Sequence, residues 1–293
     1  MPLHKLQSTD AFIAFDLPEG PATGITRLAR KVLLDGAFLL ARSTTYSFAS
    51  FGIQMGGGSA GINAEGDDRD PAVAAFVEET AALVAEHRWT TDPGLGLKEA
   101  DLAQLRIDDP RPAELWTDGL ATTLTAQGAV AAAGAVRDGG LTGARCAVVG
   151  GGPVVEAARA AVEAAGATVA DGTTPDTEAD VLFLAGKAGM LDHEAVPSVQ
   201  AGVIVPLTPV PVTARAHAEL GKAGRVHVPD FLAIAAPLLH AHADDVEDPV
   251  GAVAAKVTGL AGAGTGLWMA AVEEAEAFLR TWQDDLPFGR PLS

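Results

Sequence analysis

The 293-residue sequence has few of the features that stabilise extracellular proteins or that insert a protein into a membrane. Cys146 is its only cysteine, so the chain cannot form an internal disulfide, which is typical of a reducing compartment. Residues 1–10 are polar where a secretory signal would have an apolar core, and no apolar run is long enough to span a bilayer. We therefore expect a cytoplasmic protein that does not enter a membrane.

Positive charge and aromatic side chains are also scarce. Twenty Lys and Arg oppose 38 Asp and Glu, which gives a formal net charge of −18, and Tyr46 is the only tyrosine. Nucleic acids and anionic membrane surfaces would be repelled by this charge, so we expect neither as a partner. Hydrophobic residues make up 48% of the chain, which is enough for a sizeable core.

The pattern of apolar and turn residues predicts an α/β protein of two lobes. In the second half, short apolar segments alternate with helical ones, which indicates a doubly wound parallel sheet of the Rossmann type. We expect an N-terminal α/β substrate and oligomerisation domain over 1–120, a nucleotide-binding type of domain over 121–240, and C-terminal helices over 241–293.

Individual elements follow from local periodicity and from turn residues. In the first half, helices are expected at 28–40, at 70–86 with Asp70 as N-cap, and at 98–105. Strands are expected at 12–16 and 51–55, and a loop at 90–94. In the second half, helices are expected at 120–136 and 153–165 and two more between 250 and 282, with strands at 144–149, 166–170, 179–184, 202–205 and 225–228.

Two short motifs stand twelve residues apart in the first half. Thr45-Tyr46-Ser47 is followed by Gly56-Gly57-Gly58-Ser59. This spacing resembles the substrate-binding core of the glutamate/leucine/phenylalanine/valine dehydrogenase family, where both serine positions hold lysine. In the family, the first lysine holds the substrate carboxylate and the second assists proton transfer.

Other motifs follow in the order that the family has them. Residues 19–27 resemble its Gly-Pro-Ala segment, and Thr91-Asp92-Pro93-Gly94 resembles the segment that carries its catalytic aspartate. Residues 124–128, with Thr125 as the threonine that would approach the nicotinamide, and residues 228–231 also match. The family's asparagine positions hold other residues, at 208–210 and 234–237.

The loss of both lysines has a chemical consequence. Each role needs a positive charge or an amine whose pKa can be lowered toward neutrality, and serine supplies neither. A substrate carboxylate would find no ammonium group to neutralise it. Ordinary oxidative deamination is therefore not expected.

A second glycine turn lies at 150–152. Gly150-x-Gly152-x-x-Val155 resembles the dinucleotide fingerprint with its third glycine replaced, and a branched side chain there should push the helix outward. Asp171 falls near the expected ribose-binding position. We leave open whether NAD or NADP binds at Gly150, Gly152, Asp171 and Thr125 or whether the lobe is purely structural.

Three further patterns admit a functional and a structural interpretation. Residues 57–61 fit the hydrolase Gly-x-Ser-x-Gly elbow, with Ser59 as nucleophile, or a degraded substrate turn. His240 and His242 lack converging ligand geometry, so no metal is expected. Lys187 either replaces a lost cation or is a solvated loop residue. Asp92 either acts as an acid or base beside an apolar cleft or is a turn residue.

Three functions remain open. In the first, the chain is a family member that does not carry out dehydrogenation. It would act as a partner subunit, or bind a small ligand in the interlobe cleft, and would belong to a homo-oligomer or a hetero-oligomer. Alternatively, it is a repurposed enzyme for an imine, lactone or keto compound, with Asp92 as acid or base and Ser47, Ser59 and Tyr46 as donors. The third is an ordinary NAD(P)-dependent oxidoreductase of amino acids.

Overall fold

The structure, a computed structural model, describes residues 2–264, 266–286 and 289–292. Its contacts divide the chain into two compact units: unit 1, Met1–Ala113 with Leu279–Pro291, and unit 2, Glu114–Phe278 with Leu292–Ser293. Within the described ranges, no helix is both long and apolar enough to cross a bilayer.

Unit 1 is built on a mixed five-stranded sheet with the order β1-β2-β4-β3-β5. β2 pairs with β1 and β4 in antiparallel fashion, whereas β3 runs parallel to both β4 and β5. The carboxyl-terminal ends of β3, β4 and β5 therefore meet at one edge. The strands are β1 (Leu3–Lys5), β2 (Ala11–Phe15), β3 (Ala22–Ala29), β4 (Gly56–Asn63) and β5 (Trp89–Pro93).

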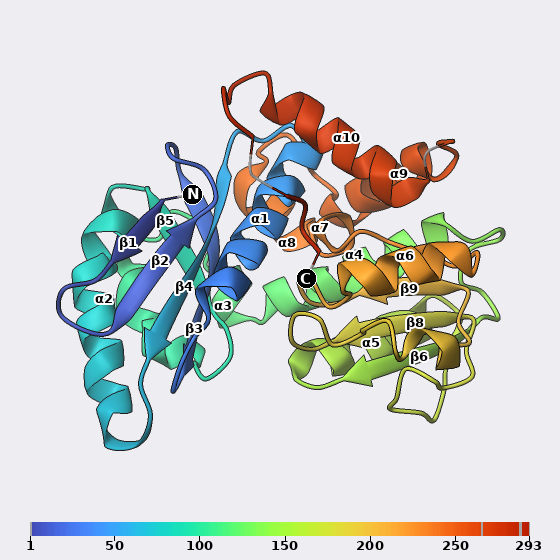
Figure 1. Cartoon of the computed structure of the whole chain (residues 1–293), viewed down its shortest axis with the longest axis horizontal. Helices are drawn as coiled ribbons and strands as arrows, with labels where there is room; N and C mark the ends of the chain where they lie inside the picture. The colour runs from blue at the N-terminus through green and yellow to red at the C-terminus, as the bar shows by residue number, and fades with distance from the viewer. Residues whose placement is uncertain (1, 265, 287–288, 293) are drawn as a thin grey trace. The chain divides into compact units, whose positions relative to one another are not determined.

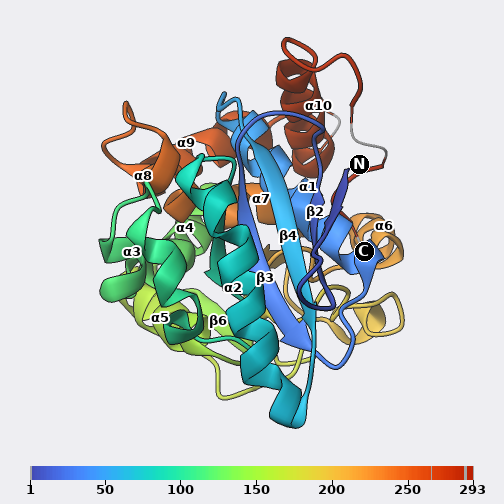
Figure 2. The same cartoon turned by 90° about the vertical axis from the view of Figure 1, so that its left-hand side faces the viewer.

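Helices cover both faces of this sheet. A Cβ on Gly57 would overlap the carbonyl of Ala41, so α1 (Leu34–Ser50) lies directly on one face of β4. Alternate side chains of a strand point to opposite faces, and a Cβ on Gly58 would overlap Trp89 in the core on the other face. That second face carries α2 (Arg69–Ala85), which Figure 2 shows lying across β3 and β4.

Several expected elements of unit 1 are wrong or shifted. Residues 28–40 are not one helix, since β3 continues to Ala29 and α1 begins only at Leu34. The expected strand at 51–55 is a turn, and the glycine run is itself the start of β4. The expected loop at 90–94 is largely β5.

The second helix is confirmed, but it begins two residues earlier than expected, at Arg69 and not at Pro71. Its N-cap is Asp68, not Asp70, and no side chain caps it. The expected helix at 98–105 is a 3-10 helix, η2 (Glu99–Ile107). A short 3-10 turn, η1 (Gly66–Asp68), precedes α2.

Unit 2 is built on a parallel five-stranded sheet with the order β10-β9-β8-β6-β7. Figure 1 shows β9, β8 and β6 side by side. The expected alternation of strand and helix is confirmed here. The strands are β6 (Arg145–Gly150), β7 (Thr168–Val169), β8 (Val181–Ala185), β9 (Val203–Pro206) and β10 (Val226–His227).

The long helix expected at 120–136 is α4, and the two expected C-terminal helices are α9 and α10. β8 is fully buried, and it packs with β9 and α6 into one apolar core. The helices are α3 (Glu114–Thr117), α4 (Leu120–Ala135), α5 (Pro153–Ala164), η3 (Val196–Ser198), α6 (Ala214–Lys222), α7 (Asp230–Ala233), α8 (Ala236–His242), α9 (Pro249–Ala261) and α10 (Leu267–Leu279).

Candidate functional site

Strand register places two expected site residues on one face of the unit 1 sheet. Ser59 of β4 pairs with Ile25 of β3, and Ile25 pairs with Asp92 of β5. Directly paired residues point to the same face, so Ser59 and Asp92 share a face and their Cα atoms lie roughly 10 Å apart. Because Gly57 is on this face too, it is the face that α1 covers.

Ser59 is completely buried in the middle of β4. Its hydroxyl has no hydrogen-bond partner among the described residues. A nucleophile elbow needs a sharp turn from strand to helix at the serine, but here the strand continues to Asn63. The hydrolase interpretation of residues 57–61 is therefore wrong.

Ser47 and Tyr46 lie near the end of α1, and both are buried. The Ser47 hydroxyl donates to the carbonyl oxygen of Ser43 at 3.2 Å. Thr45 faces β4, since its hydroxyl accepts a hydrogen bond from the Gly57 N–H at 2.8 Å. Residues two apart on a helix point in different directions, so Ser47 does not share the side of α1 that contacts β4.

Asp92 lies in a network of charged side chains. Arg111 donates to both carboxylate oxygens at 3.0 Å, and Arg106 donates to one of them at 3.3 Å. The expectation of an apolar environment for Asp92 is wrong, because two guanidinium groups surround it. Sequence analysis missed both arginines, which lie 14 and 19 residues further along the chain.

The same two arginines hold Asp109, whose side chain is only 1% exposed. Burial of Asp109 opposes its ionisation, but hydrogen bonds and charge from Arg111 outweigh burial, so its pKa is lowered. Both arginines also donate to the carbonyl oxygen of Thr91. The network therefore connects the end of β5 to η2 and to the segment after η2.

Arg27 is a second cation that the sequence analysis did not single out as a site residue. It is two residues after Ile25 on β3, so it points to the same face as Ser59 and Asp92. Its Nε and Nη2 atoms are buried and have no hydrogen-bond partner among the described residues. Burial lowers the pKa of this guanidinium. A single charged residue inside an otherwise uncharged strand was the available signal.

In unit 2, the turn after β6 keeps two features of a dinucleotide site. Gly150 has φ +126°, and a Cβ there would overlap the carbonyl of Ala185 on β8. Gly152 has φ +91°, and nothing lies within 4 Å of its Cβ position, so a ligand could approach the backbone closely. The residues present therefore fit a tight phosphate-binding turn.

The start of α5 supplies fewer donors than such a site usually has. Pro153, at the first helical position, has no N–H, and the N–H of Val155 already donates to the carbonyl of Gly152 at 3.1 Å. Val155 itself is buried on the inner side of α5 with Ala158 and Val162. The helix therefore accommodates the branched side chain.

The other two expected cofactor residues are less well placed for a ligand. Asp171 is exposed and follows β7. The Thr125 hydroxyl donates to the carbonyl of Ala121 at 2.8 Å, within its own helix α4. Lys187 is exposed after β8.

The loop after β9, in which the sequence analysis compared residues 208–210 with an asparagine segment, has an unusual backbone. Val210 has φ +55°, a left-handed conformation that is costly for a branched residue. Its N–H donates to the buried carboxylate of Asp230 at 2.9 Å. The Thr208 hydroxyl exchanges hydrogen bonds with the backbone of Gly186, so this loop is fixed to the end of β8.

His240 and His242 lie on the short helix α8, and the Nε2 atom of His240 is 3.6 Å from a Glu114 carboxylate oxygen. Among the residues that the structure describes, no three His, Cys, Asp or Glu side chains are grouped as metal ligands would be.

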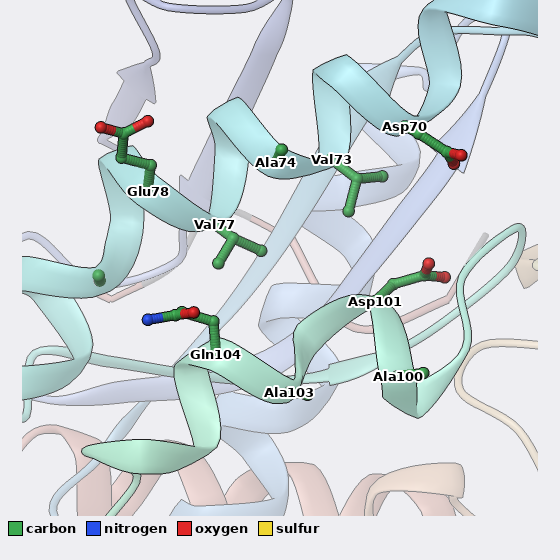
Figure 3. Close-up of a pocket in the computed structure, with 10 residues that line it drawn as sticks. Asp70, Val73, Ala74, Val77, Glu78, Ala100, Asp101, Ala103 and Gln104 are labelled. Carbon is green, nitrogen blue, oxygen red and sulfur yellow. The ribbon is translucent and has the colours of Figure 1, made fainter.

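A groove of about 790 Å³ lies between α2 and η2 of unit 1, and Figure 3 shows side chains of the two helices facing each other across it. Val73 and Val77 line it, and its carboxylates include Asp101, which binds Arg69 at 2.6 Å. None of the expected site residues lines this groove. Because α2 covers the opposite face of the sheet from α1, the groove is separate from the face that carries Ser59 and Asp92.

No protein-family model and no curated protein matches the sequence. Solved structures do match. A hetero-hexameric glutamate dehydrogenase from Thermus thermophilus, in a leucine-bound form, is 22% identical with a TM-score of 0.74, over 92% of this chain and 83% of that one. L-Tryptophan dehydrogenase from Nostoc punctiforme is 21% identical with a TM-score of 0.67, over 96% of each chain.

A lysine-to-leucine mutant of glutamate dehydrogenase is 14% identical with a TM-score of 0.75, over 92% of this chain and 81% of that one. The chain therefore has the two-domain fold of the amino acid dehydrogenases.

Proposed function

We propose that this chain is a small-ligand-binding protein with the amino acid dehydrogenase fold that does not carry out oxidative deamination, and that it acts as a subunit of an oligomer. The observation that carries the proposal is which residues occupy three positions and which groups they contact. Ser47 and Ser59 stand where the family has lysines, and Asp92 is held by two arginines.

Each of these positions lacks what deamination needs. The Ser47 hydroxyl is directed to its own helix, and the neutral Ser59 hydroxyl offers no charge to stabilise a developing anion. Both oxygens of Asp92 accept hydrogen bonds from arginine, so a reacting proton would compete with two guanidinium groups for the carboxylate lone pairs.

The Thermus protein supports the subunit role by analogy. It is a hetero-hexamer, so more than one kind of chain enters a single particle, and its structure contains leucine. A chain without the lysines could bind a related ligand in such a particle while another chain carries out the chemistry. Co-purification from the native source checks this, and a monomer that binds no ligand contradicts it.

We include NAD or NADP as a possible ligand of unit 2. Gly150 and Gly152 would accommodate the pyrophosphate, and Asp171 would contact a ribose; a bound nicotinamide would supply hydride chemistry. Quenching of NADH fluorescence by the protein measures this binding without any turnover. Asp171→Asn is the matched variant, and it should weaken binding if this carboxylate contacts the cofactor.

The deciding experiment is an assay of NAD and NADP reduction with a panel of L-amino acids. We expect no turnover above that of a boiled control, with an active glutamate dehydrogenase as positive control. Steady reduction with any amino acid would overturn the proposal. It would show that another group replaces the two lysines.

A repurposed enzyme is the second candidate, and the unpartnered Ser59 hydroxyl favours it. The substrate would be an imine, lactone or keto compound, with Asp92 as acid or base and Ser47, Ser59 and Tyr46 as donors. Activity on such a compound that survives Asp92→Asn would rule out that role for Asp92.

A further inference from the structure

Arg27 stands out among the described charged residues of unit 1 because it is half-buried, with part of its guanidinium fully buried, and forms no ion pair with any of them. Its Nε and Nη2 atoms are out of contact with solvent, and neither has a hydrogen-bond partner in the described ranges. Arg106 and Arg111, by contrast, each bind carboxylates of the same unit. An unpaired buried charge is costly, so proteins pair such charges or use them to bind ligands.

Two glycines accommodate the Arg27 side chain. A Cβ on Gly94, just after β5, would lie 2.9 Å from the Cγ of Arg27, so any side chain there would displace the arginine. A Cβ on Gly36, in the first turn of α1, would lie 3.9 Å from the Nη1 of Arg27. The guanidinium therefore extends from the end of β3 toward the amino-terminal turn of α1.

The free atoms define the chemistry of a partner. Nε and Nη2 form one edge of the guanidinium, and this edge binds a carboxylate through two parallel hydrogen bonds. The first turn of α1 adds backbone N–H groups, since its N-cap Leu33 provides no side-chain cap. Asp35 of this turn is exposed and forms no ion pair with Arg27 in the described residues.

We propose that Arg27 is the anchoring cation of a binding site for a small carboxylic acid, between the carboxyl-terminal end of β3 and the first turn of α1. This inference rests on the proposed ligand-binding role and adds the class of the ligand. Ser59 lies on the same face of the neighbouring strand β4, two residues before Gly61, which pairs with Arg27. Its hydroxyl offers a second polar contact. The arginine would take over carboxylate binding from the missing lysines.

The first experiment compares ligands by isothermal titration calorimetry with the full chain. The probes are L-leucine, 4-methyl-2-oxopentanoate and L-leucinamide. Leucinamide differs from leucine only in having a neutral amide in place of the carboxylate. We expect one or both acids to bind, and leucinamide to bind roughly ten- to hundredfold more weakly than leucine, as the loss of a charged hydrogen-bonded pair predicts. Binding of leucinamide equal to that of leucine would overturn the inference.

Variants of the arginine provide the second comparison. Arg27→Met should weaken binding of the acid by roughly ten- to hundredfold, and Arg27→Lys should retain part of it because the charge stays but the two-pronged geometry is lost. Arg30→Met is the matched control, since Arg30 is 84% exposed and should not affect binding. Unchanged affinity in Arg27→Met, with native circular dichroism, contradicts the site.

A third comparison leaves the arginine in place. Gly36→Asp would put a carboxylate of the chain itself beside Arg27 without a steric clash, whereas Gly36→Asn has nearly the same shape and no charge. We expect Gly36→Asp to abolish binding of the acid and Gly36→Asn to reduce it far less. Equal effects of the two variants would mean that Arg27 does not hold the ligand through its charge.

The outcomes separate this inference from the proposed function. If neither acid binds the wild-type chain, the Arg27 site is wrong, while the absence of deamination is judged by NAD(P) reduction alone. If amino acids are turned over, the proposed function is wrong, and the Arg27 variants still report whether the carboxylate is bound there.

Discussion

The chain contains two runs of three glycines, and they take up different kinds of backbone. Gly56, Gly57 and Gly58 begin a strand, and packing explains two of them, because a Cβ on Gly57 or Gly58 would overlap α1 or Trp89. Gly150 ends β6, and Gly151 and Gly152 connect it to α5; Gly150 and Gly152 have positive φ, and nothing lies within 4 Å of the Cβ positions of Gly151 and Gly152.

This difference shows that one sequence feature has two physical causes. In unit 1, the missing side chains let a helix and a tryptophan approach the strand closely. In unit 2, they give the backbone unusual angles and leave it open to a ligand. Of the two runs, only the second leaves its backbone open to a ligand.

The largest loss of stability is expected from a side chain added between β4 and α1. Gly57→Ala would force a methyl group into the carbonyl of Ala41, which neither backbone can avoid without moving α1. We expect a loss of at least about 3 kcal/mol of stability, at the upper end of overpacking. The urea-unfolding midpoint measures it, and a variant as stable as the wild type would contradict the packing of α1 on β4.

A similar loss is expected from breaking the charge network of unit 1. Arg111→Met would remove a guanidinium that is 3% exposed and leave Asp109 with less compensation. We expect a loss of about 3 kcal/mol, as for other broken buried ion pairs. Arg30→Met, on an 84% exposed arginine, should change stability by less than about 0.5 kcal/mol. Equal unfolding midpoints for the two variants would show that the network is not structural.

Unit 2 should respond to acid through a pair of histidines. His217 and His227 face each other with their Nδ1 atoms 3.0 Å apart, and burial lowers the pKa of His227 to about 3. The native state therefore keeps His227 neutral, while the unfolded state binds a proton below its ordinary pKa of about 6.5. Stability is full above about pH 6.5 and is lost as the pH falls toward 3.

The expected loss from this histidine is about 2 kcal/mol between pH 6.5 and pH 5. Urea midpoints at pH 7, 6 and 5 measure it. His227→Leu should flatten the dependence, whereas His4→Gln, at an exposed position in unit 1, should not. The same slope in wild type and His227→Leu would mean that other groups cause it.

The smallest change in stability is expected at Gly151, between β6 and α5. Gly151→Ala adds a methyl group where nothing lies within 4 Å, and its φ is not in the left-handed region. Stability should change by less than about 0.5 kcal/mol. Binding of NADH should weaken if the turn accepts a pyrophosphate, so unchanged quenching of NADH fluorescence would argue against a nucleotide there.

Sequence patterns predicted unit 2 better than unit 1. Apolar segments such as 181–185 alternate with helices, and the parallel sheet follows from that order. In unit 1, the strand β4 begins with three glycines, which have low strand propensity and offer no periodicity. Tertiary packing, not local preference, makes this segment extended.

The residues of the candidate site were named from a resemblance. Ser47, Ser59 and Asp92 stand at positions that match motifs of the dehydrogenase family, and the two lysines of those motifs are absent from this sequence. The partners of Asp92 were missed because Arg106 and Arg111 lie in a segment with only weak local patterns. The importance of Arg27 was missed because no sequence shows which charged side chains stay unpaired.

The sequence by itself determined the alternation of elements and the absence of two lysines, since both are properties of residues along the chain. The tertiary structure decided that β3 lies between β4 and β5, which puts Ser59, Asp92 and Arg27 on one face. The physical reason is that local periodicity sets the direction of a side chain, whereas its neighbours depend on which strands pair.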